Sequence, residues 1–267
     1  MSTQLQEPRR RLHRNLSPPK LSCQATASQG SLELPRKPGI TEVVDTAYGR
    51  MIVLSHDTNQ TAALRRGYAL DHDQIMLCSS YLEHRPPGAV VLDIGACFGT
   101  YSFGLRPVAA EVHTFEAQRM LHYCIAGSVA LNGFESVHAY HYAVGDENDM
   151  IPIPKFDYGK TMSFGSVEFG KRQKEPLHQE RQETDKPDQV RMLTVDDWHY
   201  PRVDFIKIDV EGMERKVLRG AKQTIERCHP ILLVEHIKLH APTLAQEIQQ
   251  LGYRVQNLGN DFLCTGI

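Results

Sequence analysis

VVLDIGACFGT, residues 90–100, is the stretch that decides the fold of this chain. Three apolar residues precede Asp93, two glycines follow at Gly95 and Gly99, and an apolar, helix-compatible segment begins at Tyr101. This order predicts a buried parallel strand, a tight turn and a helix N-terminus. Such a unit opens the nucleotide-binding sheets of α/β proteins.

The glycine spacing in this turn argues against a dinucleotide ligand and hence against a NAD-dependent oxidoreductase. In the fingerprint G-x-G-x-x-G, the second glycine lets the backbone approach a pyrophosphate. Counted from Gly95, that position is Cys97, and the third glycine position is Thr100. The pattern D-x-G-x-x-x-G suits a ligand that has an adenosine but no pyrophosphate. S-adenosylmethionine (SAM) is such a ligand, and Asp93 would place an acidic group near its cationic end.

The composition predicts one large α/β domain with extensions. The chain has 267 residues and a net charge of −2, which offers no electrostatic footprint for nucleic acid. Its six cysteines include no C-x-x-C pair and indicate reduced thiols in an intracellular protein. No apolar run approaches the roughly 20 residues that span a bilayer, and no secretory signal is visible. We therefore expect a cytoplasmic protein that binds neither nucleic acid nor membrane; no pattern indicates its oligomeric state.

Residues 1–40 differ from the rest because they are rich in arginine and proline and poor in acids. We interpret them as a flexible N-terminal arm. An organellar transit peptide is the less favoured interpretation, since the prolines interrupt an amphipathic helix. Residues 41–267 are then the folded domain. A charged, glycine-punctuated variable insertion at 155–190 either lines the acceptor pocket or is a disordered insertion.

Strands and helices alternate from residue 89 onward. Strands are expected at 89–94, 112–116, 137–142, 203–209, 231–235, 253–257 and 262–265, with an earlier one at 51–55. Helices are expected at 75–82, 99–107, 118–131, 213–227 and 244–251. This alternation predicts a Rossmann-like α/β fold: a mostly parallel sheet flanked by helices, with an antiparallel hairpin at its C-terminal edge.

Two features at the ends of the second and third core strands fit an adenosine. Glu116 ends its strand about 20 residues after Gly95, where an acidic residue can bind both ribose hydroxyls. A capping or solvated glutamate is the alternative. Ala143 follows the third strand at the same sheet edge, where its backbone can pass the adenine ring and Asp146 can reach the adenine amino group. An ordinary loop would explain this second feature nearly as well.

The stretch FIKIDVEGMERKVLRGA, residues 205–221, places charged groups where the reactive part of a ligand should lie. Lys207 interrupts an apolar strand, and Asp209 and Glu211 stand at the carboxyl end of that strand. In the structural alternative, Asp209 or Glu211 caps the following helix and pairs with Lys207 or Arg215. We favour a functional role for at least one of the two acids.

The fifth core strand ends in Glu235 and His236 at the same edge. His236 can act as a general base, because an imidazole titrates near neutral pH. A metal site built from Asp209, Glu235 and His236 is disfavoured, since ligands from separate strands give weak evidence, and no metal is expected.

The segments VVLDIGACFGTYSFGLR, HTFEAQ, AYHYAVGD, VRMLTVDDW, VDFIKIDVEGMERKVLRGA and PILLVEH occur in this order. Together they resemble the FkbM family of class I SAM-dependent methyltransferases, over residues 89–146 and 191–236. The resemblance implies that Asp93, Gly95, Gly99 and Glu116 contact SAM. The cofactor contacts expected with them are Ala96, Cys97, Thr100 and Ala143. Family members often carry Asn-Pro where this chain has Gln118 and Arg119, a departure that leaves the start of the next helix open.

The resemblance also implies O-methylation of a hydroxyl on a small molecule such as a sugar or a polyketide-type acceptor. Removal of the hydroxyl proton calls for a base, for which Asp209 is the first candidate, His236 the second and Glu211 the third. A nitrogen acceptor is one alternative, although the strand-four loop lacks the [D/N]-P-P-[Y/F] sequence of amino methyltransferases. A non-catalytic SAM-binding scaffold is the other alternative.

Overall fold

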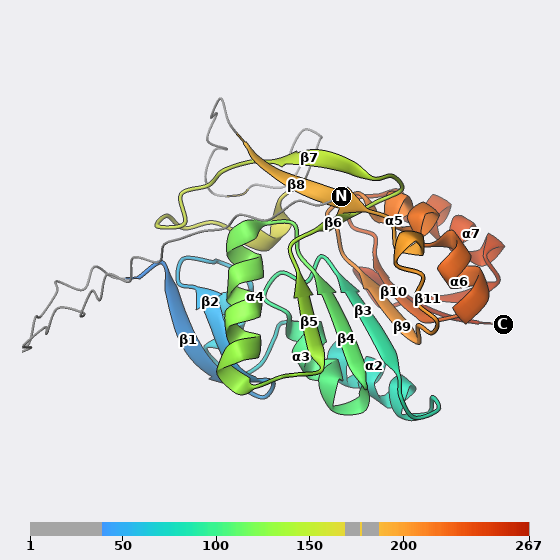
Figure 1. Cartoon of the computed structure of the whole chain (residues 1–267), viewed down its shortest axis with the longest axis horizontal. Coiled ribbons are helices and arrows are strands. Elements are labelled where there is room, and N and C mark those ends of the chain that lie inside the picture. Colours follow the sequence, from blue (N-terminus) through green and yellow to red (C-terminus); the bar gives the residue numbers. More distant parts are fainter. Residues whose placement is uncertain (1–38, 169–176, 178–186, 267) are drawn as a thin grey trace, which may run out of the picture. The chain divides into compact units, whose positions relative to one another are not determined.

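The computed structural model describes residues 39–168, 177 and 187–266 (Figure 1). The predicted N-terminal arm, apart from its last two residues, lies outside the described residues. So does the middle of the predicted insertion. No described helix is both long enough and apolar enough to cross a membrane.

A seven-stranded sheet forms the centre of the fold, in the order β11-β12-β10-β9-β3-β4-β5. Its parallel core strands are β3 (Val90–Ile94), β4 (Glu111–Phe115), β5 (Val137–Tyr140), β9 (Phe205–Ile208) and β10 (Ile231–Glu235). These match the five predicted core strands to within a few residues. Because all five run the same way, their carboxyl ends meet at one edge of the sheet.

The C-terminal hairpin completes the sheet. It consists of β11 (Tyr253–Asn257) and β12 (Asp261–Gly266). β12 is antiparallel both to β10 and to β11, so the hairpin joins through its second strand and β11 forms the outer edge. The predicted antiparallel C-terminal hairpin is confirmed. The strand that runs antiparallel to the five core strands is β12, the second strand from the edge of the sheet.

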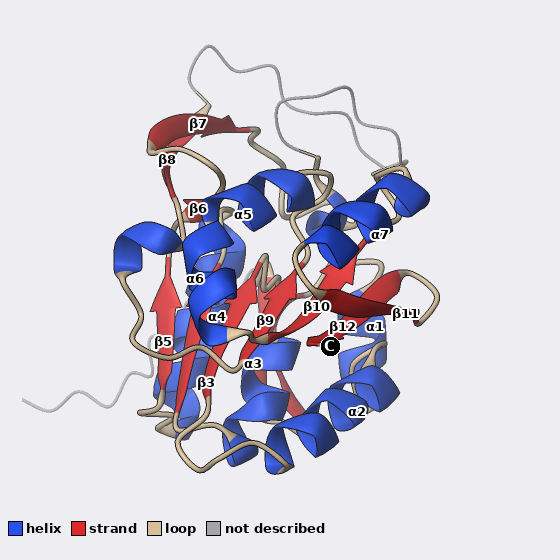
Figure 2. Cartoon of the chain, turned by 90° about the vertical axis from the view of Figure 1, so that its right-hand side faces the viewer, coloured by secondary structure: helices blue, strands red, loops and turns tan. Residues whose placement is uncertain are grey.

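Helices cover both faces of the sheet (Figure 2). One side holds α2 (His72–Glu83), α3 (Thr100–Leu105) and α4 (Arg119–Asn132), and the other holds α5 (Glu214–Gly220), α6 (Lys222–Cys228) and α7 (Ala241–Gln250). Val91 and Phe205 pack into the core on the first side, and Leu92 and Ile206 into the core on the second. This follows from the two-residue period of a strand, which sends neighbouring side chains to opposite faces.

The helix predicted at 213–227 is two helices, which meet at Ala221. Gly220 lies against the backbone of Gly145, where an added Cβ would be 1.9 Å from the Gly145 carbonyl oxygen. This close approach to a distant segment is a tertiary contact, which helical periodicity does not reveal. The helix after Glu116 begins at Arg119, one residue after the predicted start at Gln118.

Two additions stand beside the core. The first is β1 (Thr41–Thr46), β2 (Gly49–Leu54) and the short α1 (Gln60–Leu64), of which only β2 was predicted. Ser128 Oγ in α4 accepts a hydrogen bond of 2.8 Å from the backbone N–H of Ile52, which attaches the hairpin to the core. The second is a three-stranded sheet of β6 (Ala143–Val144), β7 (Asp149–Ile153) and β8 (Asp188–Leu193).

Candidate active site

A cavity of about 390 Å³ opens at the carboxyl ends of the parallel strands. This is the edge at which open α/β sheets bind ligands, and the volume lies within the range of small-molecule sites. The predicted site residues that line it are Gly95, Cys97, Glu116, Ala143, Asp209 and Glu211. Further lining residues come from the segment before β3, from the loop after β7 and from the end of β10.

The turn after β3 has the strained backbone that its glycines suggested. Gly95 has φ +81°, and a Cβ there would lie 1.7 Å from the Asp209 carbonyl oxygen, so only glycine fits. Cys97 has φ 53°, although it carries a side chain. Cys97, which occupies the position of the second glycine in the dinucleotide fingerprint, therefore has a left-handed backbone conformation. For a residue with a side chain this conformation costs about 1 kcal/mol or more.

Glu116 lies buried on the cavity wall. One carboxylate oxygen accepts a hydrogen bond of 2.9 Å from the Cys97 N–H, and the other accepts one of 2.7 Å from the Gln118 N–H. Burial raises the pKa of Glu116 to about 7, against the effect of these two donors. The carboxylate is thus fixed by the turn after β3 and the turn after β4, and it can accept further hydrogen bonds from a pair of hydroxyl groups.

Four predicted cofactor contacts do not line the cavity: Asp93, Ala96, Gly99 and Thr100. Asp93 is buried behind the turn, where its Oδ2 accepts hydrogen bonds from the Ser102 N–H (2.9 Å) and the Ser102 hydroxyl (2.6 Å). Burial raises its pKa to about 6. The structure thus gives Asp93 a role in holding α3 against β3, in place of the expected position near the cationic end of the cofactor.

The turn after β9 is capped by a residue that was not considered for this role. The Glu214 side chain accepts hydrogen bonds from the backbone N–H groups of Val210 (3.3 Å) and Gly212 (2.9 Å). Glu211 and Gly212 both have positive φ, 53° and 101°. Glu214 stabilises the turn, and no side-chain hydrogen bond caps the N-terminus of α5, so neither Asp209 nor Glu211 is the capping residue. The other part of that alternative, the pairing of Asp209 with Lys207, is observed at 3.3 Å.

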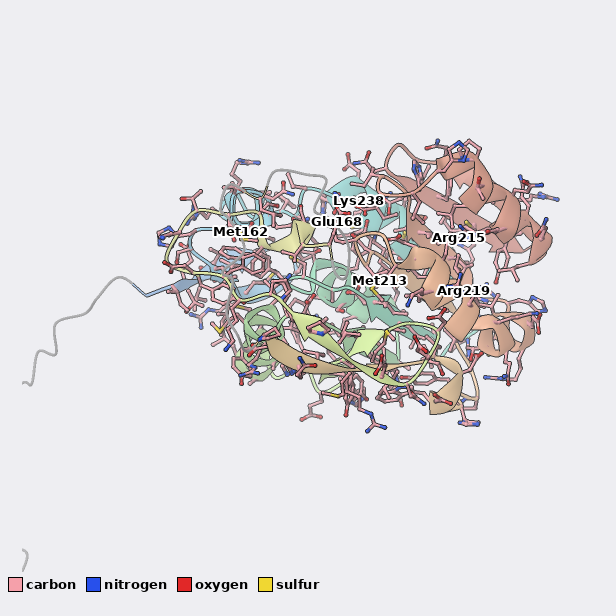
Figure 3. All side chains as sticks on the ribbon, turned by 90° about the horizontal axis from the view of Figure 1, so that it is seen from above. Met162, Glu168, Met213, Arg215, Arg219 and Lys238 are labelled. Atoms are coloured by element: carbon pink, nitrogen blue, oxygen red, sulfur yellow. The ribbon has the colours of Figure 1, made fainter. Side chains whose placement is uncertain are left out.

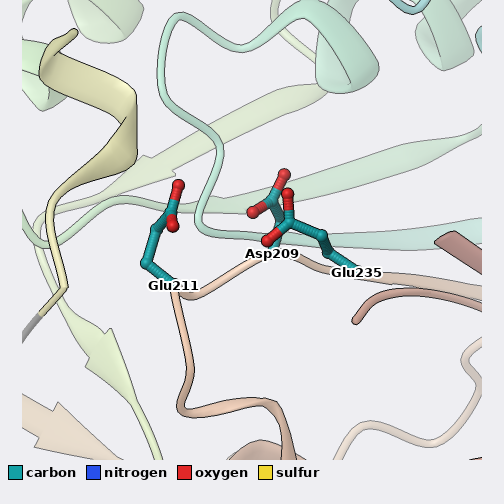
Figure 4. Close-up of side chains that lie close together, drawn as sticks. All are labelled: Asp209, Glu211 and Glu235. Carbon is teal, nitrogen blue, oxygen red and sulfur yellow. The ribbon is translucent and has the colours of Figure 1, made fainter. Parts of the chain in front are cut away.

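Asp209, Glu211 and Glu235 form a carboxylate triad in which one oxygen of each residue lies within 4.8 Å of the others (Figure 4). Lys207 Nζ lies 3.3 Å from Asp209, and Lys238 Nζ lies 3.3 Å from Glu211. Glu235 is the member of the triad that forms no ion pair with a described residue, and its buried Oε2 has no hydrogen-bond partner. Burial, together with the negative charges of Asp209 and Glu211, raises the pKa of Glu235 to about 10.

Lys207 is a buried lysine within the apolar strand β9. Its Nζ lies 2.8 Å from Asp261 as well as near Asp209, and 5.2 Å above the ring of Tyr101. Although burial disfavours the charge, the two carboxylates raise the pKa of Lys207 well above its ordinary value. The lysine is therefore charged and fixes the orientation of Asp209.

His236, the second predicted base, does not line the cavity. Its ring packs against Phe262 at a centroid distance of 4.1 Å, so Asp209, Glu235 and His236 do not come together as a set. Sequence reasoning missed Glu235 as the residue that faces the cavity. Adjacent residues of a strand point in opposite directions, but this period alone does not say which of the two points inward.

The cavity is covered by two segments that are far apart in the sequence. The lining residues from these segments are Asn59, Gln60, Leu70, Asp71, Gly165, Ser166 and Val167. Asp57 joins the segments, because its carboxylate accepts hydrogen bonds from the N–H groups of Asn59 and Thr61 (both 3.0 Å) and of Phe164 (3.2 Å). Part of the predicted insertion, residues 165–167, therefore lines the cavity.

Asp146 is not positioned to bind an adenine amino group. Its carboxylate pairs with Arg219 at 2.7 Å and with Lys216 at 3.6 Å, both on α5. Figure 3 gives the view from above, in which Arg219 lies along the same helix as Arg215. Ala143, three residues earlier, does line the cavity.

Comparison with known families gives one match, to the methyltransferase FkbM domain, over residues 93–255. This covers more than half of the chain and includes every predicted site residue. No curated protein matches the chain.

Solved structures with a similar fold include several methyltransferases. Methyltransferase FkbM from Methylobacillus flagellatus KT is 18% identical, with a TM-score of 0.48, over 67% of this chain and 43% of its own. A SAM-dependent methyltransferase from Agrobacterium tumefaciens is 10% identical, with a TM-score of 0.45, over 86% of this chain and 71% of its own. A Streptococcus mutans protein solved with S-adenosylhomocysteine (SAH) is 12% identical, with a TM-score of 0.42, over 71% and 94% of the two chains. This chain thus spans less than half the length of the first of these structures.

Proposed function

This chain belongs to the FkbM family of SAM-dependent methyltransferases, and on that premise we propose that it methylates a hydroxyl group of an uncharged or positively charged small molecule. The observation that carries the proposal is the carboxylate triad at the carboxyl ends of β9 and β10. Carboxylates accept hydrogen bonds from hydroxyl groups and can receive their protons. The triad is therefore suited to binding an acceptor that contains a hydroxyl.

The charge of the cavity supports this choice of acceptor. Five of the described lining residues are acidic: Asp71, Glu116, Asp209, Glu211 and Glu235. None of the described lining residues is lysine, arginine or histidine. A phosphorylated or carboxylated acceptor would meet like charge at short range, which opposes its binding.

The residues present also fit the cofactor. Glu116 would hold the ribose hydroxyls, and Ala143 and Val144 would border the adenine. When bound, SAM supplies an electrophilic methyl group. Asp209, fixed by Lys207, would accept a hydrogen bond from the acceptor hydroxyl and so direct its oxygen. The segments joined by Asp57 would limit the access of water to this site.

Methylation of an amine is a second candidate, because the acidic lining also suits an ammonium group. Four matched acceptors separate the possibilities: a neutral polyol, the same polyol with an added ammonium group, the same polyol with a phosphate, and an amine without a hydroxyl. Transfer of labelled methyl from SAM would be measured for each. We expect product with the first two only. Product with the amine alone would favour the second candidate, and product with the phosphorylated polyol would contradict our account of the cavity.

Asp209→Asn tests the catalytic arrangement. We expect SAM affinity in calorimetry to stay within about threefold of the wild type, while turnover falls roughly 100-fold or more, because the amide keeps the shape but presents one acceptor oxygen fewer. His236→Asn is the matched control, since His236 packs on Phe262 outside the cavity. Unchanged turnover in Asp209→Asn would remove Asp209 from the mechanism.

A further inference from the structure

The charges of the triad are incompletely balanced by protein groups. Asp209 faces Lys207 and Glu211 faces Lys238, each at 3.3 Å. Glu235 has no ion pair with any described residue, and its buried Oε2 has no hydrogen-bond partner. Among the described residues the triad therefore has two lysine partners for three carboxylates, and the third carboxylate, that of Glu235, lines the cavity that ligands enter.

Glu235 is surrounded mainly by acidic groups. The charged groups near it come from β9 and its following turn, from α5, from β12, from the segment before α2 and from the loop after β10: Lys207, Asp209, Glu211, Glu214, Asp261, Asp71 and Lys238. Five of these seven are carboxylic acids. In this setting a neutral, protonated Glu235 is favoured for as long as no ligand cation is present.

We propose that Glu235 exchanges its proton for the positive charge of the cofactor and is the proton acceptor of the methyl transfer. A cation that enters within about 4–6 Å favours the ionised form of a carboxylic acid. Binding of the sulfonium would thus release the Glu235 proton and leave a carboxylate beside the acceptor. The same group that is neutral in the free protein becomes a base only when the methyl donor is present.

The proton-acceptor half of this inference rests on the proposed function. In the transfer step, the acceptor O–H bond breaks and its proton joins the Glu235 carboxylate. An oxygen electron pair forms the bond to the methyl carbon, and the electron pair of the S–CH3 bond stays on sulfur, which becomes a neutral thioether. The positive charge of the cofactor disappears in this step, so the surroundings of Glu235 again favour its protonated form. Methyl transfer therefore makes protonation of Glu235 more favourable.

Proton release on binding tests the inference without any acceptor. Calorimetric titrations with SAM and with SAH, at about pH 7 in two buffers of different ionisation enthalpy, give the number of protons released by each ligand. We expect SAM to release up to about one proton more than SAH. Both ligands carry the same ribose, so any contribution from Glu116, whose pKa is about 7, cancels in the difference. Equal release by the two ligands would overturn the proposal.

Glu235→Gln assigns the proton to this residue. The amide imitates the neutral acid, so the variant should fold, which a thermal unfolding scan checks. We expect the SAM–SAH difference in released protons to vanish and the ratio of SAM to SAH affinity to fall roughly tenfold. Glu226→Gln, a surface change on α6, is the matched control and should keep both values. A difference that persists in Glu235→Gln would show that another group releases the proton.

The catalytic half has its own readout. With a working acceptor, Glu235→Gln should lower kcat roughly 100-fold and leave the acceptor KM within about threefold. An unchanged kcat together with a lost proton difference would confine Glu235 to cofactor binding and reject it as the proton acceptor. Failure of every hydroxyl acceptor would instead contradict the proposed function, while the proton measurements would stand.

Discussion

Asp93 and Glu116 show how two buried carboxylates near one turn acquire different roles. Both end or nearly end a parallel strand, and burial raises the pKa of each. Glu116 reaches the cavity wall and is held by the N–H groups of Cys97 and Gln118. Asp93 instead turns to Ser102 and ties α3 to the sheet. The type of residue is the same, and the backbone donors within reach decide the role.

The raised pKa of Asp93 predicts a pH-dependent cost in stability. The pKa of Asp93 in the folded protein, about 6, exceeds the ordinary value of an aspartate. The contribution of protonated Asp93 to the free energy of unfolding is therefore fully present below about pH 4 and is lost as the pH rises through about 6. Asp93→Asn removes this titration. Urea unfolding at several pH values should show that the free energy of unfolding falls less in the variant between pH 4 and 6, by about 1–3 kcal/mol. Parallel pH profiles for the variant and the wild type would refute the assignment.

At the scale of elements, the two segments that cover the cavity complete the site formed by the ends of the core strands. α1 and the loop after β7 come from regions with weak sequence patterns, yet residues from both line the cavity. A parallel β-bridge between Asp57 and Met162 and the hydrogen bonds of the Asp57 carboxylate hold them together. Gln118 Nε2 also donates to the Phe164 carbonyl at 2.7 Å, which links the cover to the turn that holds Glu116.

Asp57→Asn should loosen this cover. The amide keeps one acceptor oxygen for the N–H groups of Asn59 and Thr61, but its NH2 group then faces the Phe164 N–H. We expect SAM affinity to fall roughly tenfold and amide exchange at residues 162–167 to speed up, because a lost buried hydrogen bond costs about 1–3 kcal/mol. Asp73→Asn, an exposed change on α2, is the control. Unaltered SAM affinity in Asp57→Asn would mean that the bond to Phe164 does not position the cover.

At the scale of the molecule, the cavity is an acidic site within a chain of nearly balanced charge. Two carboxylates of the triad are paired with lysines, and the third, Glu235, is the one for which we propose ligand compensation. On this account no divalent ion is needed to hold the triad together. Dialysis against EDTA should leave SAM affinity and methyl transfer within about twofold, and added Mg²⁺ should not raise the rate. Clear stimulation by Mg²⁺ would contradict both the expectation that no metal takes part and the proposed role of Glu235.

The sequence by itself determined the parallel core, the strand-turn-helix unit at 90–100, the acid at 116 and the acidic turn after residue 208. These are local patterns: apolar runs, glycines at positions that need positive φ, and polar residues where strands end. Only the tertiary structure decided that Asp93 binds Ser102, that Glu214 caps the turn and that Glu235, not His236, faces the cavity. Each of these outcomes depends on which backbone or side-chain group lies within about 3 Å in space, and that partner is set by packing between segments rather than by spacing along the chain.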